Sequence, residues 1–223
     1  AGESTNINLP KSTSLVINSL AYAILFPNFD QNEREPIELR RFVYMDTLKT
    51  RAPFRQNFDN NPSIGSWLTI NPENRLPGWN ISPLQSGSMG SNVVTVENTP
   101  PNNSFWLGSP ILDLSISAQA SVFFDRAVGI VNPNTVLKVL ASDNGGETYT
   151  EVYRKTGSEI TTVQAANANP NNPTEFVKDF VDLTAFAGTN KKNSRIAFVL
   201  ENSDEGSSNV YLDNIELFIS ANP

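Results

Sequence analysis

The feature that most constrains the fold of this chain is a series of short apolar runs separated by turn-forming residues. Asn, Ser, Thr, Pro and Gly punctuate runs rich in Val, Ile, Phe and Leu, and no long segment combines helical periodicity with capping residues. After residue 110, the runs expected to form strands are 111–115, 119–129, 135–142, 148–155, 175–183, 195–202 and 209–220. Short strands with turn signals at regular intervals are typical of two antiparallel sheets packed face to face. The sequence therefore predicts an all-β sandwich.

The N-terminal residues suggest a division of the chain. Apolar runs at 13–26 and 37–46 predict two strands joined by a polar connection. We expect residues 1–53 to form a short N-terminal β segment, either a small or partial Ig-like domain or strands added to the main sandwich. Residues 54–223 are expected to form the main β-sandwich domain.

Composition excludes several classes of function. The 223 residues include no Cys and no His, which removes disulfides, thiolate chemistry, Cys/His zinc sites and His-based catalytic triads. A formal net charge of −7 argues against nucleic acid as a partner, because nucleic-acid binders need a basic surface. No apolar run approaches the roughly 20 residues of a membrane helix, so no membrane insertion is expected.

The segment 141–152, ASDNGGETYTEV, has two interpretations. Its spacing is close to the Asp-box of sialidases, S-x-D-x-G-x-T-W. However, Asn144 replaces the Asp of that box, Tyr149 replaces the Trp, and one copy is too few for a propeller. Asn144-Gly145 also favours a type I′ hairpin turn, whose two central residues need positive φ. We therefore predict a hairpin and draw no catalytic conclusion from it.

The order of motifs along the chain resembles the choice-of-anchor-J or cleaved-adhesin type of domain. The motifs that carry the resemblance are FRQNFDN, PGWNIS, SFWLGSPILDLS, ASVFFDRAVG, LKVLASDNGGETYTEV, FVDLTAFAGTNKKNSRIAFVLEN and VYLDNIEL, within residues 54–220. Such domains are related to MAM-like jelly rolls and are common in exported proteins of Bacteroidetes. The resemblance implies a jelly-roll sandwich at the cell surface or in a secreted protein, acting as an adhesion or carbohydrate-binding module.

The resemblance also implies a structural calcium ion, since some relatives bind Ca²⁺ between their first and last strands. The matching acids are Asp59 in NFDN and Asp213 in YLDNIEL. Calcium takes six to eight oxygen ligands, so these two acids supply only part of a site. The alternative is turn chemistry at Asp59 and strand-end hydrogen bonding at Asp213.

Residues 61–110 are rich in turns and contain all three tryptophans. Only 92–97 is expected to form a strand there. Exposed aromatic rings can stack on the apolar faces of sugars, so Trp79, Trp67 and Trp106 are candidate ligand-binding residues, with Trp79 first. The alternative is that these side chains fill the core, where each would bury a large apolar area.

We therefore expect a non-catalytic, monomeric module that binds a glycan or a surface protein. The alternatives are a structural spacer in a multidomain exported protein and a small glycoside hydrolase. A hydrolase would need two carboxylates at a defined separation. The candidates for such a pair include Glu97, Asp113, Asp125, Glu201, Asp204 and Glu205.

Overall fold

The computed structural model describes a part of the chain that includes most of residues 92–221. The described residues are 23–25, 37–39, 49–51, 53–59, 67–71, 78–84, 92–97, 99, 101–166, 169–170, 172–202 and 209–221. Contacts divide the chain into two units, Ala1–Thr47 and Leu48–Pro223. In the first unit, β1 (Ala23–Leu25) pairs antiparallel with β2 (Ile37–Leu39). No helix in the described part of the chain has the length and hydrophobicity of a membrane span.

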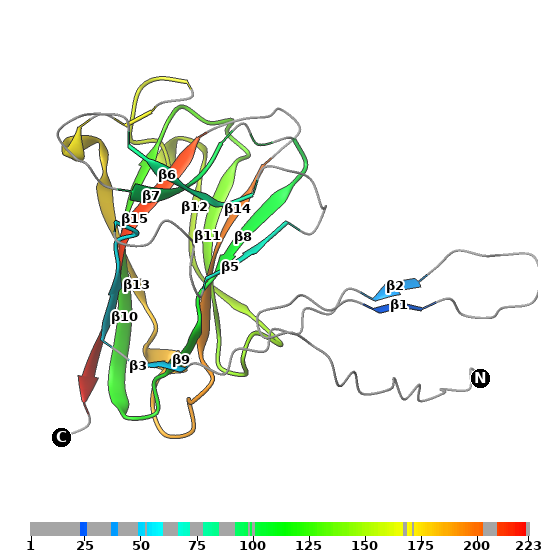
Figure 1. Ribbon diagram of the computed structural model, residues 1–223, viewed down its shortest axis with the longest axis vertical. Helices are drawn as coiled ribbons and strands as arrows, with labels where there is room; N and C mark the ends of the chain where they lie inside the picture. The colour runs from blue at the N-terminus through cyan, green and yellow to red at the C-terminus, as the bar shows by residue number, and fades with distance from the viewer. Residues whose placement is uncertain are drawn as a thin grey trace, which may run out of the picture. The chain divides into compact units, whose positions relative to one another are not determined.

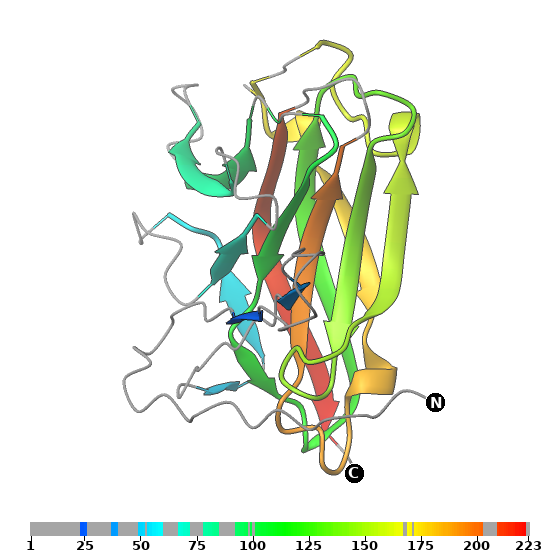
Figure 2. The same cartoon turned by 90° about the vertical axis from the view of Figure 1, so that its right-hand side faces the viewer.

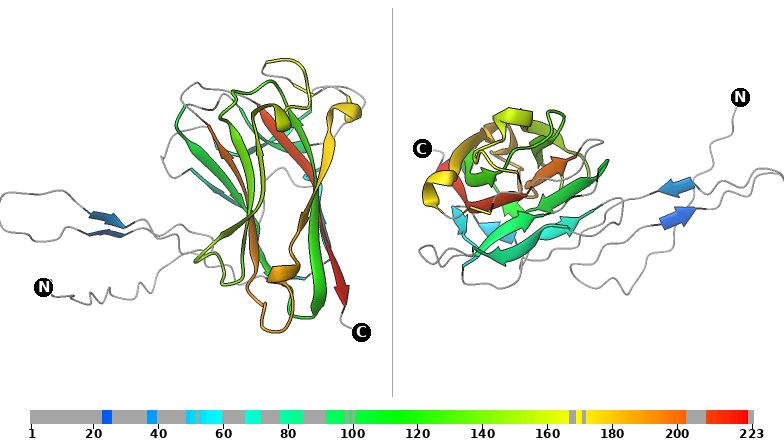
Figure 3. Two further views of the ribbon diagram at one scale, coloured as in Figure 1. Left: turned by 180° about the vertical axis from the view of Figure 1, so that it is seen from behind. Right: turned by 90° about the horizontal axis from the view of Figure 1, so that it is seen from above.

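The second unit is a sandwich of two facing antiparallel sheets, as the sequence predicts (Figures 1 and 2). The six-stranded sheet contains β13 (Val177–Asp182), β10 (Ser117–Val128), β15 (Val210–Ala221), β7 (Asn92–Val96) and β6 (Asn80–Pro83), in that order, with β4 (Phe54–Gln56) beside β15. The five-stranded sheet has the order β12 (Thr150–Thr156), β11 (Val136–Ser142), β14 (Arg195–Glu201), β8 (Ser104–Gly108) and β5 (Leu68–Ile70). Figure 3 shows the two layers from behind and from above.

Smaller elements complete this unit. Strand β3 (Lys49–Arg51) pairs in parallel with β9 (Ile111–Asp113). Residues 49–51, which were expected in the N-terminal β segment, therefore belong to the second unit. In the part of the chain that the structure describes, three short 3-10 helices connect strands: η1 (Gly157–Glu159), η2 (Pro173–Glu175) and η3 (Thr184–Phe186).

The core lies between the two sheets and is rich in aromatic rings. Phe124 of β10 and Phe198 of β14 meet edge to face, with centroids 4.9 Å apart, and both side chains are fully buried. Tyr153 packs against Phe124 at 5.6 Å, and Trp67 lies 6.2 Å from Phe198. Because edge-to-face pairs add to the free energy of burial, these rings help to hold one sheet on the other.

Strand β15 contains a β-bulge. Phe123 of β10 pairs with Glu216, but Asp125 pairs with Asp213, so β15 has one extra residue at this point. Asn214 takes a φ of +46°, a left-handed conformation that Asn tolerates better than most residues. The extra residue lies between Asp213 and Glu216, directly after a run of buried residues that ends at Asp213.

The sequence misses three strands in the turn-rich region. Besides the expected strand at 92–97, the structure places β5, β6 and β8 between residues 68 and 108. These strands are only three to five residues long, and β6 ends at Pro83, a residue that normally marks a turn or a sheet edge. Strands this short carry too few residues for their alternation to be recognised.

The predicted hairpin between β11 and β12 is confirmed, but its turn is not type I′. Positive φ occurs at Gly145 (+78°) and Gly146 (+95°), and not at Asn144. The reason is that side chains organise a longer loop: Ser142 Oγ accepts from the Gly146 N–H at 2.9 Å, and Asn144 Oδ1 accepts from the Thr148 N–H at 3.0 Å.

Alanine substitutions at three glycines test this loop. Gly145→Ala should lower the free energy of unfolding by about 1 kcal/mol, because Ala is strained at positive φ. Gly146→Ala should cost more, about 2 kcal/mol, because its Cβ would also lie 2.8 Å from Tyr149 Oη. Gly78→Ala is the control, since no atom lies within 4 Å of its Cβ position. Urea denaturation measures all three, and equal costs at Gly78 and Gly146 would contradict this account.

Candidate functional site

Three phenyl rings lie together on the outer face of the six-stranded sheet. Phe180 of β13 and Phe218 of β15 are 54% and 47% exposed. Phe123 of β10 lies between them, 5.1 Å from Phe180 and 5.4 Å from Phe218 between ring centroids. Among the described residues, Phe180 and Phe218 are the only large aromatic side chains with such exposure. We call these three rings the phenyl surface.

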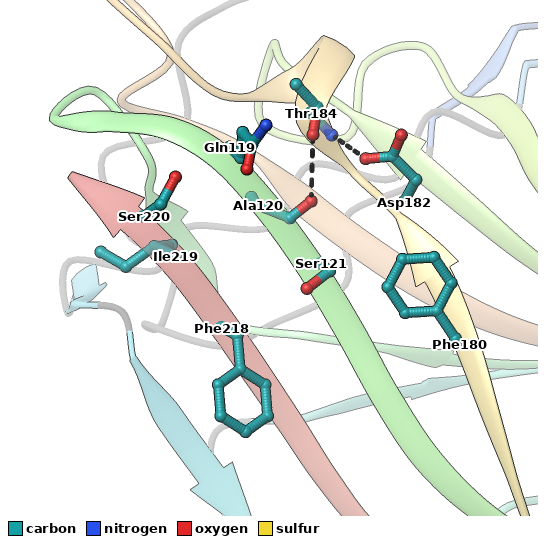
Figure 4. A pocket seen from close by; sticks show the side chains of 9 residues that line it. All are labelled: Gln119, Ala120, Ser121, Phe180, Asp182, Thr184, Phe218, Ile219 and Ser220. Carbon is teal, nitrogen blue, oxygen red and sulfur yellow. Dashed lines mark hydrogen bonds between the residues drawn. The ribbon is translucent and has the colours of Figure 1, made fainter. Parts of the chain in front are cut away.

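A polar hollow of about 460 Å³ adjoins the phenyl surface (Figure 4). Its lining residues come from β10, β13, η3 and β15: Gln119, Ala120, Ser121, Phe180, Asp182, Thr184, Phe218, Ile219 and Ser220. The Asp182 carboxylate accepts from the Thr184 N–H at 2.8 Å, and Thr184 Oγ1 donates to the Ala120 carbonyl oxygen at 3.5 Å. The rings of Phe180 and Phe218 lie on either side of β10, next to the polar side chains. Aromatic surface beside a few polar groups is typical of small-ligand sites.

The phenyl surface was not among the predicted sites, although the alternation of each strand carries a signal for it. Residues two apart on a strand share a face. Phe180 shares its face with Lys178 and Asp182, and Phe218 shares its face with Glu216 and Ser220. A phenylalanine flanked at both i−2 and i+2 by polar residues is predicted to face solvent, and both of these rings do.

A buried polar network fixes β13, the edge strand that carries Phe180. Asp179 points toward the opposite sheet, where it accepts from Tyr153 Oη at 2.7 Å and Lys155 Nζ at 2.6 Å of β12. It also pairs with the buried guanidinium of Arg126, which in turn donates to the carbonyl oxygens of Ile160 and Glu159. Burial alone would raise the pKa of Asp179, but the donors from Lys155, Tyr153 and Arg126 outweigh burial and lower it.

Two of the three candidate tryptophans belong to the core. Trp79 is 2% exposed and its Nε1–H donates to the Phe105 carbonyl oxygen at 3.0 Å. Trp67 is 5% exposed and packs against Phe54, Phe58 and Phe198. The expectation of an exposed Trp79 platform is therefore wrong, and Trp67 is equally inaccessible, because burying these large rings fills the space between the sheets.

Trp106 is partly exposed on the outer face of the five-stranded sheet. Its neighbours Phe105 and Leu107 are fully buried on the core side of β8, so alternation directs Trp106 outward. The ring packs edge-on against Tyr149, with centroids 5.7 Å apart. Burial raises the pKa of Tyr149.

The two candidate calcium ligands lie in one polar cluster beside the bulge of β15. Asp213 is 6% exposed, and its Oδ1 accepts from the Asn214 N–H at 2.6 Å. The Asn214 amide also donates to Asp125 Oδ2 at 3.0 Å, while Arg55 donates to Asn214 Oδ1 at 2.6 Å. Asp59 is held nearby through its Oδ1, which accepts from the backbone N–H of Asn92 at 3.1 Å. Strand β4, which precedes Asp59, pairs with β15, which carries Asp213. This pairing brings both acids to one place.

The electrostatics of this cluster are unfavourable for the Asp213 carboxylate. Burial raises the pKa of Asp213 to about 7, with the negative charges of Asp59 and Asp125 adding to the effect and Arg55 opposing it. The potential metal ligands of the cluster are oxygen atoms, which suit a hard cation such as Ca²⁺. Yet no three acidic side chains in the described part of the chain lie close enough together to hold a metal by themselves. A cation here would also need carbonyl oxygens and water.

The carboxylates that a hydrolase could use have separate structural partners. Asp125 pairs with Lys178 at 2.9 Å on the six-stranded sheet, and Glu201 pairs with Lys138 at 2.6 Å on the other. Asp113 Oδ1 caps a turn by accepting from Ser115. Glu97 accepts from the hydroxyl of Tyr211 at 3.4 Å, and Asp204 and Glu205 lie outside the described residues.

Comparison with known proteins establishes the fold. No protein-family model matches the chain, and a search of curated proteins found no match. Among solved structures, the chain is similar to a cleaved adhesin domain of Lys-gingipain from Porphyromonas gingivalis, with 20% identity and a TM-score of 0.55 over 77% of this chain and 99% of that one. A second cleaved adhesin domain of Lys-gingipain has 21% identity and a TM-score of 0.53 over 75% of this chain and 100% of that one.

A carbohydrate-binding module of Caldicellulosiruptor saccharolyticus, solved in complex with mannohexaose, is also similar. The identity is 14% and the TM-score 0.51, over 73% of this chain and 96% of that one. At these identities the likeness shows the fold alone. The predicted jelly-roll sandwich is confirmed, and the predicted resemblance to cleaved adhesin domains is confirmed at the level of fold.

The Asp179 network gives a prediction about acid stability. The pKa of Asp179 is lowered in the folded state, so its stabilising effect is complete above its ordinary pKa of 3.8 and is lost as pH falls through the lowered value. Asp179→Asn leaves the buried Arg126 without its counter-charge and should cost about 3–5 kcal/mol at pH 7.

Urea denaturation between pH 2 and 7 measures both effects. The wild type should lose stability as the pH falls below 4, and the variant should show a shallower loss over the same range. Glu201→Gln removes only a surface ion pair and is the control, with an expected change within about 0.5 kcal/mol. An Asp179→Asn protein as stable as the wild type at pH 7 would contradict the assigned role.

Proposed function

We propose that this chain is a non-catalytic carbohydrate-binding and adhesion module whose glycan site is the phenyl surface with its polar hollow. The observation that carries the proposal is the placement of Phe180 and Phe218, about half exposed, beside the hollow. A pyranose ring can lay its apolar face on a phenyl ring while its hydroxyl groups reach the polar side chains. The jelly-roll fold supports the proposal, because adhesin domains and carbohydrate-binding modules share it.

The chemistry of the surface favours reversible binding over catalysis. The three adjoining rings form one exposed apolar patch, and such patches are a common feature of interaction sites on soluble proteins. The three strands under the rings are paired through long antiparallel registers, so the platform is rigid before a ligand arrives. Preorganisation of this kind lowers the entropic cost of binding. We further propose that the module works outside the cell, on an exported or surface-attached protein.

Alanine substitution tests the site. For each neutral hexasaccharide that binds, Phe218→Ala and Phe180→Ala should each weaken binding at least fivefold, because about 1–3 kcal/mol of stacking is lost. Isothermal titration against cellohexaose, laminarihexaose and mannohexaose measures this. Both variants should keep the wild-type melting temperature within a few degrees, since the rings lie outside the core.

Ile130→Ala is the matched control, because Ile130 is 49% exposed and lies outside the phenyl surface. It should bind like the wild type. Loss of binding in Trp106→Ala with full binding in both Phe variants would place the glycan on the five-stranded sheet and overturn the assignment. Absence of binding to every glycan would instead favour a protein partner or a spacer.

We also propose that Asp59 and Asp213 hold a structural Ca²⁺ ion. Support comes from a buried carboxylate whose charge is only partly offset by Arg55, in a cluster rich in oxygen atoms. The Phe58 and Asp59 carbonyl oxygens, which each accept a long contact of 3.4 Å from the Asn92 side-chain amide, are main-chain candidates to complete a site. Bound at this place, Ca²⁺ would neutralise the buried charge and tie the first strand of the sheet to the last.

Thermal unfolding with EDTA and with excess Ca²⁺ tests the metal proposal. Calcium at 100 times its dissociation constant should stabilise the folded state by about 2.7 kcal/mol. Asp213→Asn should abolish the Ca²⁺-dependent shift, whereas Glu151→Gln, on the other sheet, should retain it. An unchanged melting curve in the presence of millimolar Ca²⁺ would rule the proposal out.

A further inference from the structure

The polar hollow contains one charged side chain among the described residues that line it, that of Asp182. Its Oδ1 is occupied by the Thr184 N–H at 2.8 Å, and the same threonine lowers the pKa of the carboxyl group through its side-chain and backbone hydrogen bonds. The carboxylate therefore remains ionised throughout the neutral pH range. None of the described lining residues is a cation that could offset this negative charge.

The remaining polar side chains of the hollow are available to a ligand. Gln119, Ser121 and Ser220 form no side-chain hydrogen bond within the described part of the chain, and all three lie on the same face as the phenyl surface. Together they offer hydroxyl and amide groups that can both donate and accept, whereas an ionised carboxylate can only accept. Pairs of adjacent sugar hydroxyls are donors of the kind that a carboxylate oxygen binds well.

We propose that Asp182 is a specificity-determining residue, which selects saccharides with adjacent free hydroxyl groups and rejects saccharides that carry carboxylate or sulfate groups. The inference rests on the proposed function and adds the chemical class of its ligand. A negative group placed in the hollow would lie close to the Asp182 carboxylate with no cation to balance it. The net charge of the chain, −7, adds a weaker repulsion of the same sign at low ionic strength.

The test compares ligands that differ only at C6 of their sugar rings. Cellohexaose, laminarihexaose and mannohexaose are each titrated beside their C6-oxidised forms, in which hydroxymethyl groups have become carboxylates. For each hexasaccharide that binds, the oxidised form should bind at least fivefold more weakly at 20 mM NaCl. The difference should shrink at 500 mM NaCl, because salt screens the repulsion between exposed charges.

Asp182→Asn separates the local carboxylate from the charge of the whole chain. Asn can still accept from the Thr184 N–H and keep the start of η3 in place, so the fold should be retained. Binding of the neutral saccharide should weaken about tenfold, and the preference for it over the oxidised form should nearly vanish. Glu201→Gln makes the same change in net charge on the opposite sheet and should leave both affinities unchanged.

The outcomes distinguish this inference from the proposed function. Equal or tighter binding of an oxidised saccharide to the wild type would overturn the inference while leaving a glycan-binding module intact. The inference also fails, and the module remains, if Asp182→Asn and Glu201→Gln behave alike. If no saccharide of either kind binds, the proposed function fails and the inference falls with it.

Discussion

The contact between Phe124 and Phe198 is the interaction on which the rest of the sandwich depends. It joins β10 of the six-stranded sheet to β14, the central strand of the five-stranded sheet, and both rings are fully buried. Once Phe124 points inward, the period of two residues in a strand directs Phe123 outward. Antiparallel pairing then aligns Phe123 with Phe180, and Phe218 lies diagonally across from it. The exposed phenyl surface is thus the outer counterpart of the aromatic core.

Alternation also explains which residues hold the edge of this sheet. On β13, Asp179 and Val181 face inward while Phe180 and Asp182 face outward. An inward carboxylate is costly unless it is paired, and Arg126, Tyr153 and Lys155 supply that pairing from the neighbouring strand and the opposite sheet. The network therefore fixes the position of the edge strand, and with it one wall of the polar hollow.

Sequence patterns predict this architecture better than they predict its surfaces. The long strands are predictable because their runs and turns are distinct, as at 135–142 and 195–202. The roles of Trp67 and Trp79 are not, because loop context says little about burial when a short strand or loop folds over the core. The bulge at Asn214 depends on how β15 pairs with β10, a long-range property that no local pattern contains. Without that pairing, the burial of Asp213 cannot be derived.

The proposed glycan site and the proposed cation site depend on the same two strands. Three residues of β10, each two positions from the next, belong to these sites. Ser121 lines the hollow, Phe123 belongs to the phenyl surface, and Asp125 belongs to the polar cluster beside the bulge. The bulge lies between Asp213 and Glu216 of β15, whereas Phe218 and Phe123 both lie on one side of it, where the register is regular. The ladder between β10 and β15 therefore sets the spacing of the rings. The bulge sets the position of the phenyl surface relative to Asp125 and Asp213.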